Sequence, residues 1–394
     1  MTAFWGCEVE HASLEHRDPA LLLRVENGDG TWSAPAGDVP ANQRIGALTW
    51  SYVGQTQIYS EPPPPLDYAE VITQDSRQSL TERLLGTRRY DTLGRTWEVV
   101  RVDEAALDPE LVARAAAHVP EVVPPDQLGT VENWTPLSWS VAACEFPFIE
   151  DSLWVWGVEN RYSVGWPSST TSFTDRQETV VQLRASGNPI CTGVLLRPDW
   201  VLTSAHCLVD DTGVLKVATG LIDVISVYNE FEAVAAGGVT VAAGWNGTLK
   251  YDWALIELVN DHPSVTHTMN LYQGSDSDFT SIGANVHNLG FPAYTWDATF
   301  GGCERNGSLT PHLMHQANGE VTSSPAKSIR LKMDVSTGNS GGPIYFCPFG
   351  ADDVCGGGEK GMVIGVASGF ANATDRVKGP KASYFAVEAL SIMP

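Results

Sequence analysis

Short apolar runs separated by turn-forming residues make up most of the C-terminal part of the chain. Beyond about residue 165, runs such as VVQLRA, TGVLLR and WVLT alternate with Gly, Asn and Asp positions. Runs of this length, bounded by such residues, are typical of β-strands, and their number indicates a barrel or a sandwich. We therefore expect a mostly β fold in this part.

The N-terminal part has a different pattern. The first sixty residues alternate apolar runs with turns such as NGDG and predict a small β domain over 1–60, which ends at the EPPPPL stretch of 61–66. Residues 61–160 predict a mixed α/β region acting as a linker or pro-segment, with a strand at TWEVVRV and helices at SLTERLL and DPELVARAAAHV. In the second helix, Asp108 is the expected N-cap and Pro109 the first helical residue. The strand-rich domain is expected over 161–394.

Charge and cysteine content limit the classes of function. The formal net charge of −23 disfavours nucleic-acid binding, and no apolar run is long enough to span a membrane. Among the seven cysteines, the pairs Cys191 with Cys207 and Cys347 with Cys355 bracket short segments and suggest disulfides, while Cys7, Cys144 and Cys303 stay unassigned. We expect a secreted or periplasmic protein. A cytoplasmic one is the alternative, because the start MTAFWGCEVEH lacks the features of a signal peptide.

Candidate chemistry centres on Ser340 in the glycine-rich stretch TGNSGGP. A serine hydroxyl becomes a nucleophile only when a base removes its proton, so a histidine and an orienting carboxylate are required. His206 lies in SAHC at the end of an apolar run, and Asp252 lies in DWAL immediately before another. Each residue alone has an ordinary structural explanation; the three segments together indicate a Ser-His-Asp catalytic triad.

With these motifs, residues from about 160 to 394 resemble a chymotrypsin-fold, trypsin-like serine protease. The bacterial glutamyl-endopeptidase (V8-like) branch is the most similar, through Asp175-Arg176, GFP at 290–292, GEV at 319–321 and DVSTGNSGG. The resemblance implies a double β-barrel with the triad between the barrels, and an oxyanion hole formed by the backbone N–H groups of Gly338 and Ser340. Peptide or protein substrates are implied, and no cofactor is.

One residue departs from the trypsin pattern. Asn339 precedes the nucleophile where trypsin-like enzymes have an aspartate that pairs with the N-terminus released on activation. A neutral amide cannot make that ion pair. We therefore expect activity without an inserted ammonium group, although Ser163-Val164-Gly165 after Arg161 resembles a V8-like mature start, and the residues before it could form a removable pro-segment.

The resemblance also implies a substrate pocket. Asp334, six residues before Ser340, favours cleavage after Arg or Lys, although a structural role in the loop is nearly as well supported. Cleavage after small apolar residues is the next alternative. Ala367 stands where V8-like enzymes have their specificity histidine. Ser368 is expected to support the triad and the substrate backbone, and Gly369, Phe370 and Ala382 to line the pocket.

FWGCEVE near the start resembles the opening of nucleoplasmin-like domains, β-sandwiches that form pentamers; an ordinary edge strand explains it as well. If the resemblance holds, the acidic N-terminal part is a homo-oligomerisation module.

The sequence as a whole is compatible with three functions: an active endopeptidase, an inert protease-fold scaffold, or an acidic oligomeric chaperone that carries a protease domain. Calcium is a weak possibility, because no ligand spacing of the EF-hand kind is present.

Overall fold

The computed structural model of the protein describes most of the chain from residue 42 onward and two short stretches before it. The described residues are 25–26, 31–33, 42–56, 58–59, 68–71, 73, 78–117, 125–136, 153–154, 162–165, 175–226, 233–263, 265–274, 285–292, 294–297, 302–305, 314–323, 327–333, 335–336, 338–347, 361–371 and 376–394. Among them, no helix has the length and apolar character needed to cross a membrane. FWGCEVE lies outside the described residues, so the nucleoplasmin-like resemblance stays a prediction.

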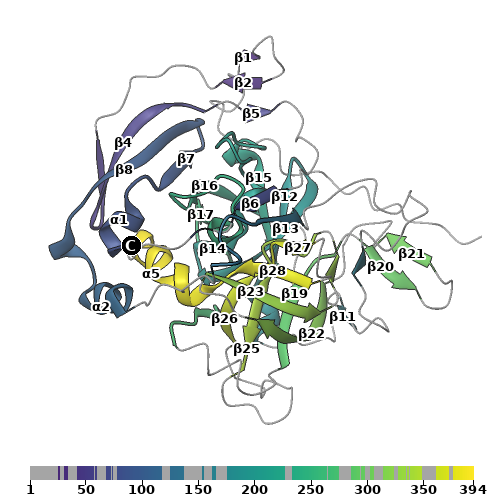
Figure 1. Cartoon of the computed structure of the whole chain (residues 1–394). Coiled ribbons are helices and arrows are strands. Elements are labelled where there is room, and N and C mark those ends of the chain that lie inside the picture. Colours follow the sequence, from purple (N-terminus) through teal and green to yellow (C-terminus); the bar gives the residue numbers. More distant parts are fainter. Residues whose placement is uncertain are drawn as a thin grey trace, which may run out of the picture.

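Six strands form a closed barrel near the middle of the molecule (Figure 1). They lie in the order β15-β12-β13-β14-β17-β16, and β15 also pairs with β16, which closes the ring. The strands are β12 (Val180–Ala185), β13 (Asn188–Arg197), β14 (Trp200–Thr203), β15 (Ile222–Ser226), β16 (Ala233–Val241) and β17 (Ala254–Leu258). Every residue of β14 is buried, as its continuous apolar run predicts.

A second sheet supplies the other half of the fold. Its strands lie in the order β18-β26-β25-β19-β22-β23-β28-β27-β9-β6, and β11 pairs with β22 outside this path. They are β18 (Asn270–Leu271), β19 (Asn285–Gly290), β22 (Met314–Ser323), β23 (Ser328–Met333), β25 (Pro343–Phe346), β26 (Met362–Val366), β27 (Gly369–Ala371), β28 (Arg376–Pro380), β9 (Val131–Pro136), β6 (Tyr68–Val71) and β11 (Tyr162–Gly165). The closed barrel and this half-barrel confirm the predicted double-barrel fold.

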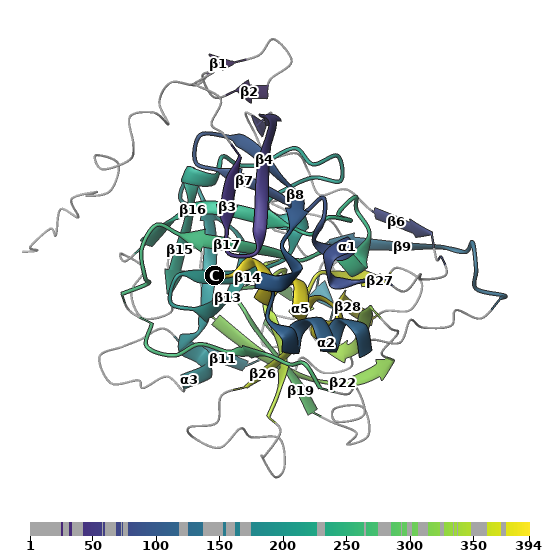
Figure 2. The same cartoon turned by 90° about the vertical axis from the view of Figure 1, so that its left-hand side faces the viewer.

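Strands from the N-terminal part extend both sheets. β7 (Arg88–Asp91) pairs with β16 of the barrel, and β8 (Arg95–Val102), β4 (Leu48–Gln55) and β3 (Gln43–Ile45) continue the same sheet (Figure 2). β6 and β9 end the second sheet. The hydrogen-bonded sheets therefore run across the predicted boundaries at 60 and 160, and those boundaries stay a prediction.

Two helices from the N-terminal part and the C-terminal helix pack together beside the barrel (Figure 1). They are α1 (Leu80–Leu84), α2 (Pro109–Ala117) and α5 (Ala382–Ile392). A capping box between Ser79 and Glu82 starts α1, and Asp108 accepts a hydrogen bond from Glu110 N–H at the start of α2. The helices predicted at SLTERLL and DPELVARAAAHV are therefore present.

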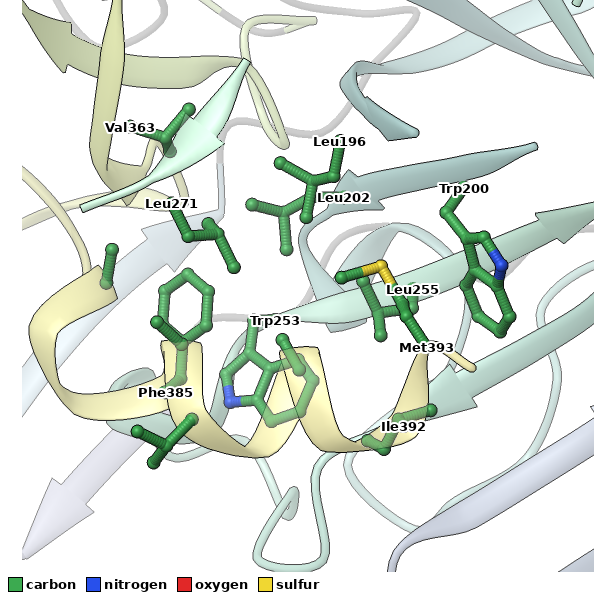
Figure 3. Close-up of a cluster of buried hydrophobic side chains, with 14 of the residues drawn as sticks. Leu196, Trp200, Leu202, Trp253, Leu255, Leu271, Val363, Phe385, Ile392 and Met393 are labelled. Carbon is green, nitrogen blue, oxygen red and sulfur yellow. The ribbon is translucent and has the colours of Figure 1, made fainter. Parts of the chain in front are cut away.

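The described residues form a large apolar core between the barrel and α5 (Figure 3). The ring of Trp253 is fully buried and stacks on Phe385 of α5, with 5.4 Å between the ring centroids. Leu202 and Leu255 come from neighbouring barrel strands and join the same cluster. Because Trp253 follows Asp252 directly, this packing fixes the position of that carboxylate.

Further short strands and one short helix lie outside these two sheets. They are β1 (Val25–Glu26), β2 (Thr31–Ser33), β5 (Ile58–Tyr59), β10 (Leu153–Trp154), β20 (Tyr294–Asp297), β21 (Gly302–Arg305), β24 (Val335–Ser336) and α3 (Asp175–Glu178). β1, β2 and β5 form a small sheet, β10 pairs with β24, and β20 pairs with β21.

The structure describes one predicted disulfide in full and one cysteine of the other. Cys191 and Cys207 form the predicted disulfide, with 6.2 Å between their Cα atoms. Cys347 is also disulfide-bonded. Its predicted partner Cys355 lies outside the described residues, as do Cys7 and Cys144. Cys303 lies on β21, and its side chain is not among those described.

Candidate active site

The pairing of two barrel strands brings His206 and Asp252 together. β14 and β17 are antiparallel, with Thr203 opposite Ala254, so the end of β14 lies beside the start of β17. His206 is in the short 3-10 helix η4 (Ala205–Cys207) that follows β14, and Asp252 directly precedes Trp253 and β17. The disulfide at Cys207 ties η4 back to β13. Local sequence thus places both side chains at the same end of the barrel.

The three predicted catalytic side chains form one hydrogen-bonded chain. His206 Nδ1 lies 2.7 Å from Asp252 Oδ2, and His206 Nε2 lies 2.8 Å from Ser340 Oγ. Asp252 Oδ1 also accepts a hydrogen bond of 2.8 Å from the backbone N–H of His206. A carboxylate only accepts, so Nδ1 carries the imidazole proton and Nε2 is left to accept the proton of Ser340.

Ser340 sits in a turn that glycines make possible. Gly338 and Gly341 have φ values of +94° and +82°, in the left-handed region that favours glycine. A Cβ on Gly341 would lie 2.0 Å from the carbonyl oxygen of Thr192. Only glycine fits there, because the turn packs directly against β13.

Thr192 of β13 holds this turn from the first barrel. Its hydroxyl donates to the carbonyl of Gly338, and its N–H donates to the carbonyl of Ser340, each at 2.8 Å. The backbone N–H groups of Gly338 and Ser340 donate to no other described residue. The oxyanion role predicted for these two N–H groups stays a prediction.

Asn339 is part of a buried amide pair. Its Nδ2 donates to Asn288 Oδ1 at 2.7 Å, and Asn288 Nδ2 donates to the carbonyl of Pro343 at 3.1 Å. Both side chains are buried. Asn339, which stands where the trypsin pattern has an aspartate, is thus hydrogen-bonded to a neutral side chain of the second sheet, Asn288.

Ser368 and Gly369 lie beside Ser340. Ser340 Oγ is 3.2 Å from the carbonyl oxygen of Ser368, and the Ser368 hydroxyl is 3.3 Å from the hydroxyl of Ser204. Gly369 and Phe370 begin β27, the strand that follows; the Phe370 side chain is not among those described. Asp334 lies outside the described residues. Ala382 is buried in the large apolar core at the start of α5.

Sequence reasoning missed Lys216. Its Nζ donates to the carbonyl oxygen of His206 at 2.7 Å, and the residue is buried. Burial lowers the pKa of the Lys216 amine, and the nearby charges of Asp252, Asp210 and Asp211 oppose that shift. Only the three-dimensional arrangement shows that this lysine supports the backbone of the candidate base.

Sequence reasoning also missed Trp134. This residue lies on β9, in the region predicted to be a linker or pro-segment. Its ring meets the imidazole of His206 edge to face, with 6.0 Å between the centroids. His206, Asp252 and Ser340 all have 0% relative exposure. The candidate site is therefore covered.

A metal at this site is not supported by the donor set. Cys191, His206 and Cys207 lie close enough together to be considered as ligands. However, the two sulfurs are bonded to each other, and His206 is engaged by Asp252 and Ser340. A disulfide sulfur has no thiolate to offer to a metal.

Comparison with known proteins adds the family. The Trypsin family model matches residues 168–384, which is more than half of the chain. An uncharacterized peptidase of Corynebacterium glutamicum (strain R) is 29% identical over 184 residues, covering 45% of this chain and 55% of the relative. A glutamyl endopeptidase of Bacillus licheniformis is 24% identical over 161 residues, covering 39% of this chain and 45% of the relative.

The chain thus spans about half the length of these curated relatives. A solved structure of a Glu endopeptidase in complex with MPD is 18% identical, covers 59% of this chain and 97% of its own, and has a TM-score of 0.45. The match of the family model to the segment that holds His206, Asp252 and Ser340 confirms the recognition made from the motifs: the chain belongs to the Trypsin family of serine peptidases.

Proposed function

We propose that this protein is a serine endopeptidase that cleaves peptide bonds through an acyl-enzyme on Ser340. The observation that carries the proposal is the continuous hydrogen-bonded chain from Asp252 through His206 to Ser340 Oγ. In the first step Ser340 Oγ attacks the scissile carbonyl carbon while His206 Nε2 takes the hydroxyl proton. The imidazolium that forms is stabilised by the Asp252 carboxylate.

The mechanism also requires stabilisation of the oxyanion that forms on the attacked carbonyl. The N–H groups of Gly338 and Ser340 donate to the tetrahedral oxygen, and His206 returns its proton to the leaving amine as the C–N bond breaks. Water, deprotonated by the same imidazole, then hydrolyses the ester and regenerates the Ser340 hydroxyl. Loss of one oxyanion donor typically costs about 10²- to 10³-fold in kcat.

For the residue on the acyl side of the cleaved bond, we propose Arg or Lys. The support is Asp334, six residues before Ser340 in the sequence, because its carboxylate would pair with a cationic substrate side chain. The name of the Bacillus licheniformis relative points to glutamate for that protein. In this chain the position expected for a glutamate-binding histidine is Ala367, which is fully buried and offers no cation. A peptide library assayed with the parent chain and with Asp334→Asn separates the two preferences.

A compartment follows from the same chemistry. We propose an oxidising one, secreted or periplasmic, because the Cys191–Cys207 disulfide holds η4 and thereby the position of His206. Release of activity from the periplasm or medium of the producing cell supports this location, and activity confined to the cytoplasm refutes it.

Fluorophosphonate labelling tests the catalytic proposal. The full chain, before and after limited proteolysis, is compared with Ser340→Ala and His206→Ala. Labelling that needs both Ser340 and His206 in either sample supports a working triad. Absence of Ser340-dependent labelling in both samples refutes it and favours an inert protease-fold scaffold.

A further inference from the structure

The edge of β27 beside Ser340 is a place where an extended peptide would bind. Ser368, whose carbonyl lies 3.2 Å from Ser340 Oγ, leads directly into β27. One edge of β27 pairs with β28, so a further strand can pair only with the opposite edge. Proteins commonly bind extended peptides by adding them as a strand to such an edge. A peptide bound there would run past the nucleophile.

β9 of the same chain already occupies this edge. It pairs antiparallel with β27, with Pro136 opposite Gly369, Thr135 opposite Phe370 and Trp134 opposite Ala371. Its far edge is covered in turn by β6. Because β9 uses the pairing edge of β27, a peptide cannot form the same backbone ladder while β9 is in place.

Trp134 extends this obstruction to the catalytic base. Its ring is 1% exposed, contacts His206, and packs on Tyr68 of β6 at 4.8 Å between centroids. Tyr68 in turn meets Trp245 at 5.7 Å. For attack, a carbonyl carbon must come within about 3–3.5 Å of Ser340 Oγ. With Ser340 fully covered, no substrate reaches that distance unless something moves.

Glu132 ties β9 to the sheet by charge. Its carboxylate lies 2.9 Å from Arg330 Nη2 on β23 and also pairs with Lys378 on β28. The Lys378 side chain is 1% exposed, so the ion pair compensates a buried cation. The contact therefore holds β9 by an interaction that a single charge change weakens.

The contacts that keep β9 docked also leave one buried hydrogen-bond donor unsatisfied among the described residues. Trp134 Nε1 is buried and has no hydrogen-bond partner among the described residues. A buried donor left unpaired disfavours the docked state. By contrast, β7 is joined to the barrel by four residue pairs with β16, and α1 is joined to α5 by the buried Arg83–Glu388 ion pair.

We propose that β9 is an internal inhibitor strand: it fills the peptide-binding edge of β27 and covers His206, so the intact chain is latent until β9 leaves. The proposal rests on the proposed peptidase function. Activation then requires release of β9 alone, with β7, β8 and α1 still docked.

Two variants of the full chain test this idea. Glu132→Gln removes the charge that holds β9, and Trp134→Ala removes the ring over His206. Glu110→Gln is the matched control for the first, because it breaks the exposed Glu110–Arg114 pair on α2, and Val131→Ala, at an exposed position of β9, is the control for the second. Far-UV circular dichroism verifies that each variant folds.

Two readouts are measured on every variant: the rate of fluorophosphonate labelling of Ser340, and hydrogen exchange of the amides of Gly369–Ala371. We expect Glu132→Gln and Trp134→Ala to raise the labelling rate at least tenfold and to speed exchange in β27, while both controls match the parent chain. Parent labelling as fast as that of the variants overturns the inhibitor role and leaves the peptidase function intact.

The two proposals fail in different ways. If exchange in β27 speeds up in both variants while Ser340 stays unlabelled, the peptidase function fails, and the inhibitor role fails with it. If neither exchange nor labelling changes in the folded variants, while limited proteolysis of the parent chain allows labelling, the inhibitor role of β9 is refuted alone.

Discussion

At the residue scale, the candidate site depends on a few side chains that contact one another across the two sheets. Thr192 belongs to the barrel, yet it holds both Gly338 and Ser340 in the turn before β25 of the second sheet. Gly341 allows that contact, since any larger residue would meet the Thr192 carbonyl oxygen. Small changes in this turn should therefore act on the nucleophile more than on the rest of the fold.

Gly341→Ala tests this dependence. The added Cβ would lie 2.0 Å from Thr192 O at a φ of +82°, so the turn must shift and displace Ser340. We expect labelling of Ser340 in the protease-treated chain to fall at least ~100-fold, as for loss of an oxyanion donor. Gly187→Ala is the control, because φ is +85° there and no atom lies within 4 Å of the added Cβ. It carries a strain of about 1–2 kcal/mol and should label normally. Equal losses in both variants would contradict the steric explanation.

Asn339 offers a second residue-scale prediction. Asn339→Asp replaces the donor to Asn288 Oδ1 with an acceptor, so two oxygens face each other in a buried site. We expect the free energy of unfolding at pH 7 to fall by about 2 kcal/mol. Burial raises the pKa of the new carboxyl above its usual value of about 3.9, and the protonated form can donate to Asn288. The deficit should be smallest below about pH 4 and grow as pH rises through the raised pKa.

Thermal unfolding from pH 3 to 8 measures this deficit. Asn246→Asp is the control, because Asn246 is exposed and the carboxylate keeps the oxygen that accepts from Thr248. A deficit that does not change with pH would show that the charge on residue 339 is not its cause.

At the element scale, the inhibitor role proposed for β9 rests on two side chains of this strand. Glu132 and Trp134 lie two residues apart and contact the sheet and His206, while Asn133 between them is exposed. Alternation of this kind lets one face of a strand carry the recognition. A free peptide with the same two side chains should therefore compete for the same edge.

A synthetic peptide of residues 129–136 tests this expectation. Against the Trp134→Ala chain, which keeps a weakened β9, we expect competitive inhibition of peptide hydrolysis. A peptide with glutamine in place of glutamate should bind about tenfold more weakly, which corresponds to ~1.4 kcal/mol, because it cannot offer the buried Lys378 ammonium the carboxylate that Glu132 provides. A scrambled peptide of the same composition is the control; inhibition equal to that of the native order would show that register is unimportant.

At the scale of the whole molecule, the N-terminal part is built into the fold of the peptidase. β7 joins the barrel through β16, and α1 packs on α5 near the C-terminus. Arg83 of α1 pairs with Glu388 of α5 and donates to the carbonyl of Tyr384. Burial raises the pKa of Glu388, and the charge of Arg83 opposes that shift. We therefore expect α1 and the C-terminal helix α5 to stabilise each other.

Glu388→Gln measures that dependence. Leaving Arg83 as a buried, unpaired cation should lower the free energy of unfolding by about 3 kcal/mol. The control Glu110→Gln breaks an exposed pair with Arg114 and should cost less than about 1 kcal/mol. Replacing Arg83 and Glu388 together by methionine should recover most of the loss. Urea unfolding gives the values; a loss for Glu388→Gln within the range of the control would mean that this pair does not couple the two ends.

The sequence was enough to predict the candidate catalytic residues but not the residues that surround and support them. His206, Asp252 and Ser340 could be chosen because each sits in a short motif next to a strand end, and their geometry in the structure matches the hydrogen bonds a triad requires. Lys216, Thr192 and Asn288 could not, because their motifs are ordinary and their importance comes from contacts made across the fold. Ala382 was assigned to the pocket from its neighbours in sequence; it is buried at the start of α5, and its pocket role stays a prediction.

The sequence by itself determined the family, the mostly β architecture and the order of the candidate catalytic residues, because each of these is written in local patterns: strand-length apolar runs and motifs of a few residues. Only the tertiary structure decided where β9 lies. Val131–Pro136 reads as an unremarkable segment, and its pairing with β27 is a contact between strands more than 230 residues apart. Such a pairing depends on which sheet edge is free and which side chains bury together, and that information exists only once the chain has folded.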